Sequence, residues 1–300
     1  MELLRFDEQV VVITGAGHGL GRSYARLLAA RGAKVVVNDL GGGIDGAPPE
    51  PGAQSPAQDV VDEILAAGGH AVASGHDISD EESARACVQL ALDTFGRVDG
   101  VINNAGINPS APFVLTPRAV FEKVLAVHLL GAWSVTQAAW PHFVEQGYGR
   151  VLNTCSGAMY QGHGTRATYS AAKGALYGLT RDLAVEGGDH GIKVNGLCPG
   201  ALTRMMADSR PEVRARAAAW TPDAVANVVT VLMHRDCPVN GEVIESRGGQ
   251  VHRIFMAIAP GVVLDTDSMT PEDVAAQMDT VLDPGVPIEV GALIDHRGPR

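Results

Sequence analysis

Short runs of valine and isoleucine alternate with longer helical stretches over the first 200 residues of the chain. Apolar runs of this length, bounded by glycine or polar residues, are typical of strands buried on both faces of a sheet. A repeated strand–helix–strand order predicts parallel strands with helices covering both faces. We therefore predict one doubly wound α/β domain. Its expected strands are residues 10–14, 34–39, 70–75, 98–104, 150–156 and 192–200.

The strand–helix rhythm ends near residue 248, so we expect a domain over residues 1–248 and a C-terminal extension over residues 249–300. We expect the extension to pack on the same domain. It contains one predicted helix, residues 270–282, with Thr270 as its N-cap and Pro271 in its first turn.

Composition and charge indicate a folded protein that does not bind polyanions. Hydrophobic residues make up 46% and charged residues 19% of the 300 residues. The net charge of -11 at pH 7 argues against nonspecific binding to nucleic acid or to an anionic membrane. No apolar run approaches the roughly 20 residues of a membrane-spanning helix. We expect neither a nucleic-acid partner nor a membrane.

Cysteine spacing and the chain ends predict a cellular compartment. The four cysteines lie far apart without a Cys-x-x-Cys pair, which favours neither a metal site nor a disulfide framework. The first ten residues lack a secretory pattern, and the ending DHRGPR is not the peroxisomal Ser-Lys-Leu address. We expect a cytoplasmic protein.

A glycine-rich turn, TGAGHGLG at residues 14–21, joins the first expected strand to the following helix. Backbone N–H groups at such a helix start favour a pyrophosphate. Side chains at Gly15, Gly19 or Gly21 would obstruct the turn, the ligand or the contact between helix and strand. The common G-x-G-x-x-G pattern is not met, because Leu20 stands at its last glycine position. Any tight strand–helix turn favours glycine, but the place after the first strand favours dinucleotide binding.

Asp39 ends the second expected strand, about twenty residues after the turn, where an acid contacts the cofactor ribose. A carboxylate there accepts hydrogen bonds from the ribose hydroxyls of NAD and repels the 2′-phosphate of NADP. His18 is a weak cation that does not offset this charge. We predict NAD, the alternative being that Asp39 only caps a turn. The Gly/Pro-rich residues 41–55 that follow are functional or mobile, and their role is open.

Tyr169 and Lys173 lie four positions apart in YSAAK, which puts them on one face of a helix. Hydride transfer to a carbonyl leaves charge on the oxygen, which then needs a proton. A tyrosine with a pKa of about 10 is a poor base at neutral pH, and a nearby ammonium favours its phenolate. Ser156, at the end of the fifth strand, would hold the substrate oxygen. A solvated polar stripe is the weaker alternative, because Ala172 and Leu176 already mark a buried face.

Several motifs together resemble the short-chain dehydrogenase/reductase family. They are the glycine turn, NNAG at residues 103–106, Ser156 thirteen positions before Tyr169, YSAAK, and the pair Pro199 and Gly200. The resemblance covers approximately residues 6–250. A narrower similarity, carried by VVVNDLGGG, AVHLLGAW and ESRGGQVHRI, is to the dehydrogenase unit of peroxisomal multifunctional enzyme type 2 and its actinobacterial single-domain relatives. That unit is a (3R)-hydroxyacyl-CoA dehydrogenase, also known as a 17β-hydroxysteroid dehydrogenase.

The resemblance implies a Rossmann-type, mostly parallel sheet of seven strands and a set of residue roles. Tyr169 would be the general acid/base, Lys173 its electrostatic partner and a ligand of the nicotinamide ribose, and Ser156 the group that positions the substrate. His128 replaces an asparagine that in most of the family holds a water of the proton relay; it supports the relay or is a core histidine. No metal is implied. The implied cofactor-binding residues are Thr14, Gly15, Gly19, Leu20, Gly21, Asp39, Asp77, Ile78, Asn104, Ala105, Gly106, Tyr169, Lys173, Pro199, Gly200 and Thr203.

Three further residues have both a functional and a structural interpretation. Asp77 contacts the adenine ring or stabilises a turn. Asn103 forms the floor of the cofactor site or is a hydrogen-bonding residue at a strand end. Cys155, beside Ser156, is favoured as a small buried hydrophobe over a nucleophile.

Residues 201–220 would form a mobile flap over the substrate. We expect Met205 and Met206 to line an acyl path. Arginines in the flap would meet the phosphates of a coenzyme A ester, or else form an ordinary solvated helix face. They are Arg204, Arg210, Arg214 and Arg216. The helix that carries Trp133 and Trp140 usually builds a dimer interface in the family, so we expect a homodimer or homotetramer.

We predict NAD-dependent interconversion of a secondary alcohol and a ketone, with (3R)-hydroxyacyl-CoA as the first-choice substrate. A 17β-hydroxysteroid or a steroid-side-chain CoA ester is the nearest alternative. A catalytically silent dinucleotide-binding protein is an alternative of another class. The presence of Ser156, Tyr169 and Lys173 together argues against the silent protein.

Overall fold

The computed structural model divides the chain into two compact units, Met1–Arg253 and Ile254–Arg300. The predicted boundary after residue 248 stays a prediction, as does the packing of the extension on the domain. The structure describes the whole chain except residues 1–2, 163, 207–210, 212–214, 216 and 284–300.

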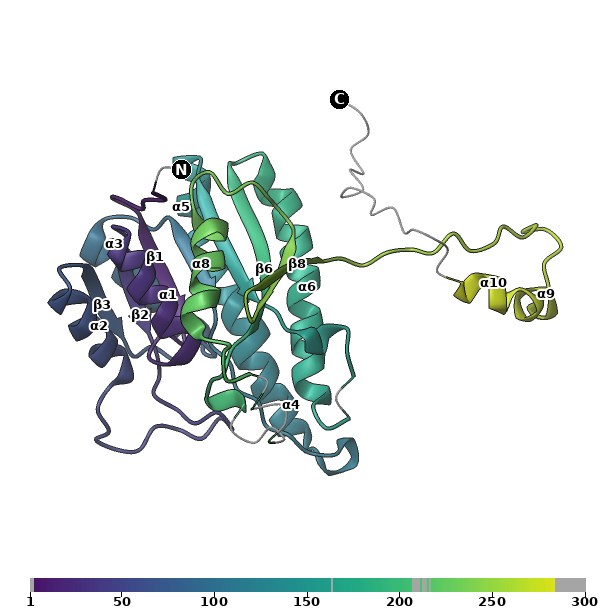
Figure 1. Ribbon diagram of the computed structural model, residues 1–300, viewed down its shortest axis with the longest axis horizontal. Helices are drawn as coiled ribbons and strands as arrows, with labels where there is room; N and C mark the ends of the chain where they lie inside the picture. The colour runs from purple at the N-terminus through teal and green to yellow at the C-terminus, as the bar shows by residue number, and fades with distance from the viewer. Residues whose placement is uncertain (1–2, 163, 207–210, 212–214, 216, 284–300) are drawn as a thin grey trace. The chain divides into compact units, whose positions relative to one another are not determined.

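The larger unit is built around an eight-stranded sheet. Its strands are β1 (Val10–Thr14), β2 (Lys34–Asn38), β3 (His70–Ser74), β4 (Gly100–Asn103), β5 (Gly149–Thr154), β6 (Ile192–Gly200), β7 (Val243–Arg247) and β8 (Gln250–Ile254). They are hydrogen-bonded in the order β3-β2-β1-β4-β5-β6-β7-β8, and every pair up to β7 is parallel (Figure 1). The return of the chain from β3 to β4 makes the β1–β4 pair the switch point, beyond which open α/β sheets bind ligands.

The fold class is the predicted one, but the sheet has an eighth strand beyond the seven expected. Gly248 and Gly249 alone join β7 to β8, with φ angles of 55° and 80°. So short a connection permits only an antiparallel hairpin, and two left-handed residues suit its tight turn. β8 is mostly exposed and has no apolar run, so the sequence carried no strand signal there.

Helices cover both faces of the sheet (Figure 1). Helices α1, α2 and α8 pack on one face, and α3, α5 and α6 on the other. Because neighbouring strand residues point to opposite faces, Val11 and Ile13 enter the first core, while Val10 and Val12 enter the second. The helices are α1 (Gly19–Ala30), α2 (Pro56–Ala66), α3 (Glu81–Phe95), α4 (Arg118–Leu125), α5 (Gly131–Gln146), α6 (Ala167–Gly188) and α8 (Pro222–Met233).

A π-helical turn, η2 (Ala126–Leu130), joins α4 and α5 into one continuous helix of 29 residues. Within the described residues, this is the one helix that is long and apolar enough to cross a membrane by length and composition alone. It packs against α3, β4 and β5. The wide turn carries His128, which is buried.

The described part of the second unit, up to residue 283, contains two short helices, α9 (Pro271–Ala276) and α10 (Met278–Leu282). Thr270 caps α9 as predicted: its hydroxyl accepts from the Asp273 N–H, and the Asp273 carboxylate accepts from the Thr270 N–H. The single helix predicted over residues 270–282 is interrupted at Gln277, whose ψ of 2° leaves the helical region.

Candidate active site

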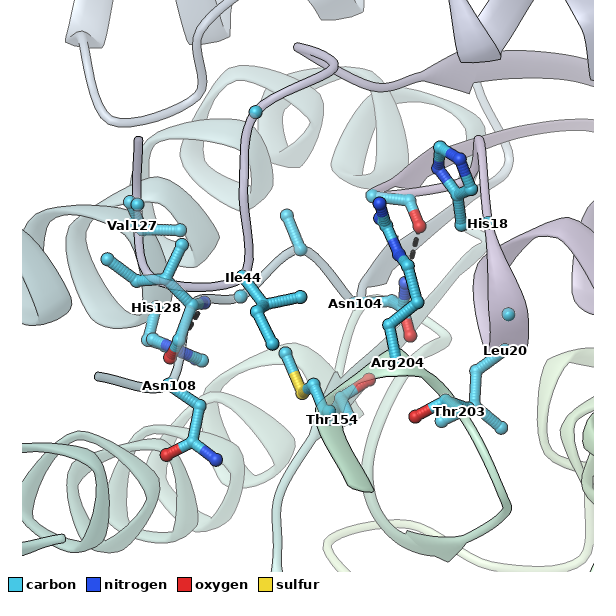
Figure 2. A pocket seen from close by; sticks show the side chains of 18 of the residues that line it. His18, Leu20, Ile44, Asn104, Asn108, Val127, His128, Thr154, Thr203 and Arg204 are labelled. Atoms are coloured by element: carbon cyan, nitrogen blue, oxygen red, sulfur yellow. Dashed lines mark hydrogen bonds between the residues drawn. The ribbon is translucent and has the colours of Figure 1, made fainter. Parts of the chain in front are cut away.

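A cavity of about 440 Å³ opens at the carboxyl ends of β1, β2, β4, β5 and β6 (Figure 2). It brings together residues from eight separate stretches of the sequence. Of the predicted site residues, Thr14 and Gly21 do not line it. Those that line it are Gly15, Gly19, Leu20, Asp39, Asp77, Ile78, Asn104, Ala105, Gly106, His128, Ser156, Tyr169, Lys173, Pro199, Gly200 and Thr203.

The glycine turn between β1 and α1 requires glycine at several points. Gly15 and Gly19 have φ angles of 63° and 51°, in the left-handed region that other residues rarely adopt. A Cβ at Gly21 would lie 2.3 Å from the carbonyl oxygen of Gly15, so the turn packs directly against the helix. Among the described residues, α1 has no side-chain cap and no acid in its first turn. Its first N–H groups therefore face the cavity without a competing carboxylate.

Thr14 and Asn104 hold this turn in place through hydrogen bonds. Asn104 also lines the cavity, whereas Thr14 does not. The Thr14 hydroxyl accepts from the N–H groups of Asn104, at 3.0 Å, and Ala105, at 3.1 Å. The Asn104 amide donates to the carbonyl oxygens of Thr14 and Gly15. These bonds tie the end of β1 to the end of β4, which fixes the floor of the cavity.

Asn103 and Asp77, which each have a functional and a structural interpretation, form the contacts that the structural interpretation predicts. Asn103 is buried and donates to Thr136 and to Asn153, each at 2.9 Å, in the core beneath the cavity. The Asp77 carboxylate accepts from the N–H of Ser79 at 2.9 Å, which is the geometry of an Asx turn. Asp77 also lines the cavity.

Asp39 connects the glycine turn to the segment that follows β2. Its carboxylate accepts from the N–H of Gly17 at 2.9 Å and from the N–H of Gly41 at 2.8 Å. It also lines the cavity, so one side chain both caps the turn and faces the cavity. Burial and the charge of Arg204 lower the pKa of the neighbouring His18, which keeps this imidazole neutral.

Tyr169 and Lys173 stand one turn apart on α6, as the spacing predicts. Lys173 is buried, and its ammonium donates to the carbonyl oxygen of Thr154 at the end of β5. The ammonium lies 5.5 Å from the centre of the Tyr169 ring. Ser156 begins the short turn η3 (Gly157–Met159), where its hydroxyl accepts from the N–H of Ala158 at 3.2 Å, and it lines the cavity together with Tyr169. The predicted phenol, ammonium and hydroxyl thus meet at one end of the cavity.

The electrostatics of this group differ from the sequence-based expectation. Burial raises the pKa of Tyr169, while the hydrogen bond with Ser156 and the charge of Arg166 lower it in part. Burial also lowers the pKa of Lys173 to about 8. We had expected Lys173 to lower the pKa of Tyr169, but its ammonium is directed to a backbone carbonyl and burial has the larger effect.

His128 packs directly against Tyr169. The two rings meet edge to face, with their centres 5.3 Å apart. The Nε2 atom of His128 contacts the backbone of Ile107, 3.0 Å from its nitrogen and 2.7 Å from its oxygen, while the buried Nδ1 atom has no partner within the described structure. Burial and the Lys173 charge lower the pKa of His128 to about 3, so the ring is neutral. A Cβ at Gly106 would lie 2.3 Å from this ring, so the close contact requires glycine.

With this geometry established, comparison with known proteins assigns the family. Residues 9–214 match the family model described as short chain dehydrogenase. The chain belongs to the short-chain dehydrogenase family. It is therefore an oxidoreductase of the kind that acts on CH–OH groups.

Three relatives show how far the similarity extends. The dehydrogenase is 43% identical to a short-chain type dehydrogenase/reductase of Mycobacterium tuberculosis over 92% of this chain and 95% of the relative. It is similar to the peroxisomal multifunctional enzyme type 2 of Drosophila melanogaster, with a TM-score of 0.79 and 34% identity over 97% of this chain and 48% of that structure. A 7α-hydroxysteroid dehydrogenase complexed with NADH and a 7-oxo bile acid has a TM-score of 0.73 and 30% identity over 82% and 95% of the two chains. The chain thus spans about half of the multifunctional relative.

Residues 41–49 of the dehydrogenase, here called the strap, cross the cavity and were not predicted as part of the site. Ile44 of the strap points into the cavity (Figure 2). The N–H of Asn108 donates to the Ile44 carbonyl oxygen at 2.7 Å, and the Lys123 ammonium donates to the Gly46 carbonyl oxygen. The one sequence signal for the strap is the long Gly/Pro-rich stretch after Asp39.

The predicted flap of the dehydrogenase is described only in part. Arg204, Met205 and Met206 form the short turn η4 (Arg204–Met206) and line the cavity. The other predicted flap arginines, Arg210, Arg214 and Arg216, lie outside the described residues. Arg166, which the sequence analysis did not select, also lines the cavity near Tyr169.

The cysteine beside Ser156 is buried and unreactive in its setting. Burial raises the pKa of the Cys155 thiol to about 11. A thiol with such a pKa carries little thiolate at neutral pH, as a small core residue should. Among the described residues, no cluster of side chains is suited to hold a metal ion.

Proposed function

We propose that this dehydrogenase uses NAD to interconvert a secondary alcohol and a ketone, with a (3R)-hydroxyacyl-CoA as the substrate. The observation that carries the proposal is the meeting of Tyr169, Ser156 and Lys173 at one end of a cavity whose other end is the glycine turn. Such a cavity holds a long ligand at one end and a small reacting group at the other.

The residues present fit a dinucleotide. The glycine turn forms one end of the cavity, and the uncapped start of α1 offers N–H groups to a pyrophosphate. Asp39 would accept from the ribose hydroxyls, since a carboxylate has about four acceptor sites and two of its bonds are to N–H groups. When bound, NAD supplies the nicotinamide carbon that accepts or returns the hydride.

NAD is favoured over NADP by the charges around Asp39. A 2′-phosphate would lie beside this carboxylate and would need a nearby cation. Arg22, on α1, already pairs with Glu63 through two bonds of 3.2 and 2.7 Å. Burial and the charge of Arg204 lower the pKa of His18, which leaves this imidazole little positive charge. Arg204, which lines the same cavity, is assigned here to a phosphate of the acyl-CoA.

Tyr169 would give a proton to the carbonyl oxygen in reduction and take it from the alcohol in oxidation. Ser156 would donate to the same substrate oxygen and hold it near the phenol. Lys173 fixes its own position by donating to the Thr154 carbonyl oxygen, which leaves its other N–H groups free for the cofactor ribose.

His128 is proposed as a positioning residue. Its ring supports one side of Tyr169 and holds the backbone of Ile107 at the cavity wall. Its unpartnered Nδ1 atom, buried near the Lys173 charge, is suited to hold a water of a proton relay. The relay role and the packing role of His128 are therefore compatible, because different parts of the ring would serve each.

The acyl-CoA proposal is supported by the resemblance to multifunctional enzyme type 2 and by Met205 and Met206 on the cavity wall. Arg204 lines the same cavity and would meet a phosphate group. A hydroxysteroid is the second candidate, supported by the likeness to the 7α-hydroxysteroid dehydrogenase. A homodimer or homotetramer in the cytoplasm is part of the proposal, and Trp133, half exposed on α5, would lie in the subunit interface.

The test is NADH formation with (3R)- and (3S)-hydroxyacyl-CoAs of several chain lengths and with a panel of hydroxysteroids. We expect turnover of the (3R) esters, and a fall of at least about 100-fold in kcat for Tyr169→Phe. Tyr177→Phe, on the same helix, is the matched control and should keep full activity. Binding of NADH without turnover of any of these alcohols would refute the proposal and favour a silent dinucleotide-binding protein.

A further inference from the structure

The strap connects the two ends of the proposed cofactor site. It begins at Gly41, whose N–H binds the Asp39 carboxylate at the ribose end. Its tip reaches the opposite wall, where the Ile44 carbonyl oxygen accepts from Asn108 at 2.7 Å and the Gly46 carbonyl oxygen accepts from Lys123. A dinucleotide extending from Asp39 to Tyr169 would therefore pass beneath the strap.

We propose that Lys123 is a positioning residue that latches the strap over the bound dinucleotide and thereby sets its rate of release. The inference rests on the proposed function, because it takes the cavity to be the cofactor site. In many enzymes, opening of such a segment or product release rather than chemistry limits turnover.

The tip of the strap is a preformed turn that can move as one piece. The N–H of Gly43 donates to the Ala47 carbonyl oxygen at 2.9 Å, and the N–H of Gly46 donates to the Gly43 carbonyl oxygen at 3.0 Å. The Asp45 carboxylate accepts from the N–H of Ala47. Gly41, with a φ of 84°, stands between this turn and β2, where backbone rotation is least restricted. Opening therefore requires loss of the contacts to the far wall, but not unfolding of the turn.

Lys123 is available for the latch because no carboxylate competes for it. Among the described residues it forms no ion pair, and its neighbour Glu122 binds Arg118 at 2.7 Å. Gly46 leaves room for its stem: a Cβ at Gly46 would lie 3.1 Å from the Lys123 Cε atom and 3.1 Å from the Ile107 Cδ1 atom. A charged donor on a backbone carbonyl is among the stronger hydrogen bonds of this kind.

The same anchor lies next to the catalytic end of the cavity. Asn108, which binds Ile44, follows Ile107, whose backbone contacts the His128 ring. That ring packs on Tyr169. A closed strap therefore supports the wall on which the proposed proton donor rests.

The test is the dissociation rate of NADH, followed by its fluorescence in stopped flow, for wild type and Lys123→Met. Methionine keeps the apolar stem and removes the donor. We expect dissociation to become about threefold to tenfold faster, as loss of one hydrogen bond allows. Association should also become faster, so the Kd should rise less than the dissociation rate. Lys123→Arg keeps a charged donor and should keep NADH release slow. Lys34→Met removes only an exposed ion pair with Glu8 and should leave the dissociation rate unchanged.

Hydrogen exchange separates this inference from the proposed function. Without added cofactor, the peptide that contains Asn108 should exchange faster in Lys123→Met than in wild type, with an unchanged Tm. Equal exchange in the two proteins would overturn the latch, whatever the cofactor. Normal NADH binding with equal dissociation rates would also overturn it. Faster exchange in a protein that binds no dinucleotide would instead refute the proposed function.

Discussion

Lys173 is buried and Tyr169 is half-buried in the cavity wall, and desolvation shifts both pKa values toward the neutral forms. The phenol is therefore protonated at neutral pH, and its proton is available to a substrate oxygen. The hydrogen bond with Ser156 and the charge of Arg166 act in the opposite direction. In the proposed mechanism, the balance between these effects sets which direction of the reaction is fast at a given pH.

We expect the two directions of the reaction to respond differently to pH. Because the pKa of Tyr169 is raised above its ordinary value of about 10, the phenol stays protonated throughout the neutral range, so reduction, which needs the phenol, should stay level up to about pH 9. Oxidation needs the phenolate, whose small fraction grows with pH, and should rise over the same range. Initial rates in both directions between about pH 6 and pH 9 will show this. A flat oxidation profile would rule out Tyr169 as the titrating base.

Replacing Asp39 with asparagine should weaken the preference for NAD over NADP. The substitution removes the charge that repels a 2′-phosphate. The Kd for NADPH divided by the Kd for NADH should therefore fall by about tenfold or more. Fluorescence titration with NADH and NADPH measures this ratio. Asp62→Asn, exposed on α2, is the control, and an unchanged ratio in Asp39→Asn would contradict the proposed role.

Spacing along the chain predicted the site residues whose neighbours are local. The glycine turn and the Tyr169–Lys173 pair each lie within one short stretch, so periodicity brings their members together. The contacts of Lys123 with Gly46, 77 positions away, and of His128 with Ile107, 21 positions away, depend on how distant segments fold. No local pattern encodes such a contact.

At the scale of secondary structure, apolar runs located strands β1 to β6. They did not locate β7 or β8, and β8 lies at the sheet edge with most of its side chains in water. The predicted helix over residues 270–282 is interrupted at Gln277 although its cap at Thr270 is present, because caps and composition mark a start more reliably than an interruption.

Two glycine-to-alanine changes should have opposite effects on stability. A Cβ at Gly106 would lie 2.3 Å from the His128 ring, so Gly106→Ala should cost about 1–3 kcal/mol of unfolding free energy and lower kcat. Gly178, inside α6, has nothing within 4 Å of its added Cβ, so Gly178→Ala should stabilise the protein by up to about 1 kcal/mol. Urea denaturation distinguishes the two. A neutral Gly106→Ala would mean that the His128 ring can move away.

At the scale of the whole molecule, the sheet separates two hydrophobic cores. The buried side chain of Arg150 connects several segments of the chain at the amino-terminal end of this sheet. Arg150, at the start of β5, is 4% exposed. Its guanidinium donates to the carbonyl oxygens of Gly149, Gly191, His234 and Arg235, which belong to three segments of the chain. It also lies 4.3 Å from the centre of the Tyr148 ring. Arg150 therefore stabilises the amino-terminal end of the sheet, opposite the cavity.

We expect Arg150→Met to lower the unfolding free energy by about 2–4 kcal/mol, because four buried or partly buried hydrogen bonds to carbonyl groups lose their charged donor. Chemical denaturation of the folded enzyme measures this. Arg118→Met removes an arginine whose side chain is 88% exposed and should cost less than about 0.5 kcal/mol. Similar losses of unfolding free energy in the two variants would show that Arg150 does not stabilise the amino-terminal end of the sheet as described. NADH affinity should not change in either variant.

The π-helical turn at Ala126–Leu130 has an evolutionary consequence. A π-helical turn corresponds to one inserted residue in an α-helix, and a one-residue deletion can restore regular geometry without shifting either flanking segment. Such a deletion would leave the two halves of the long helix seated on the sheet as before, yet carry the imidazole away from the tyrosine. Gain or loss of a single codon could thus change the support of the reacting phenol while sparing the scaffold.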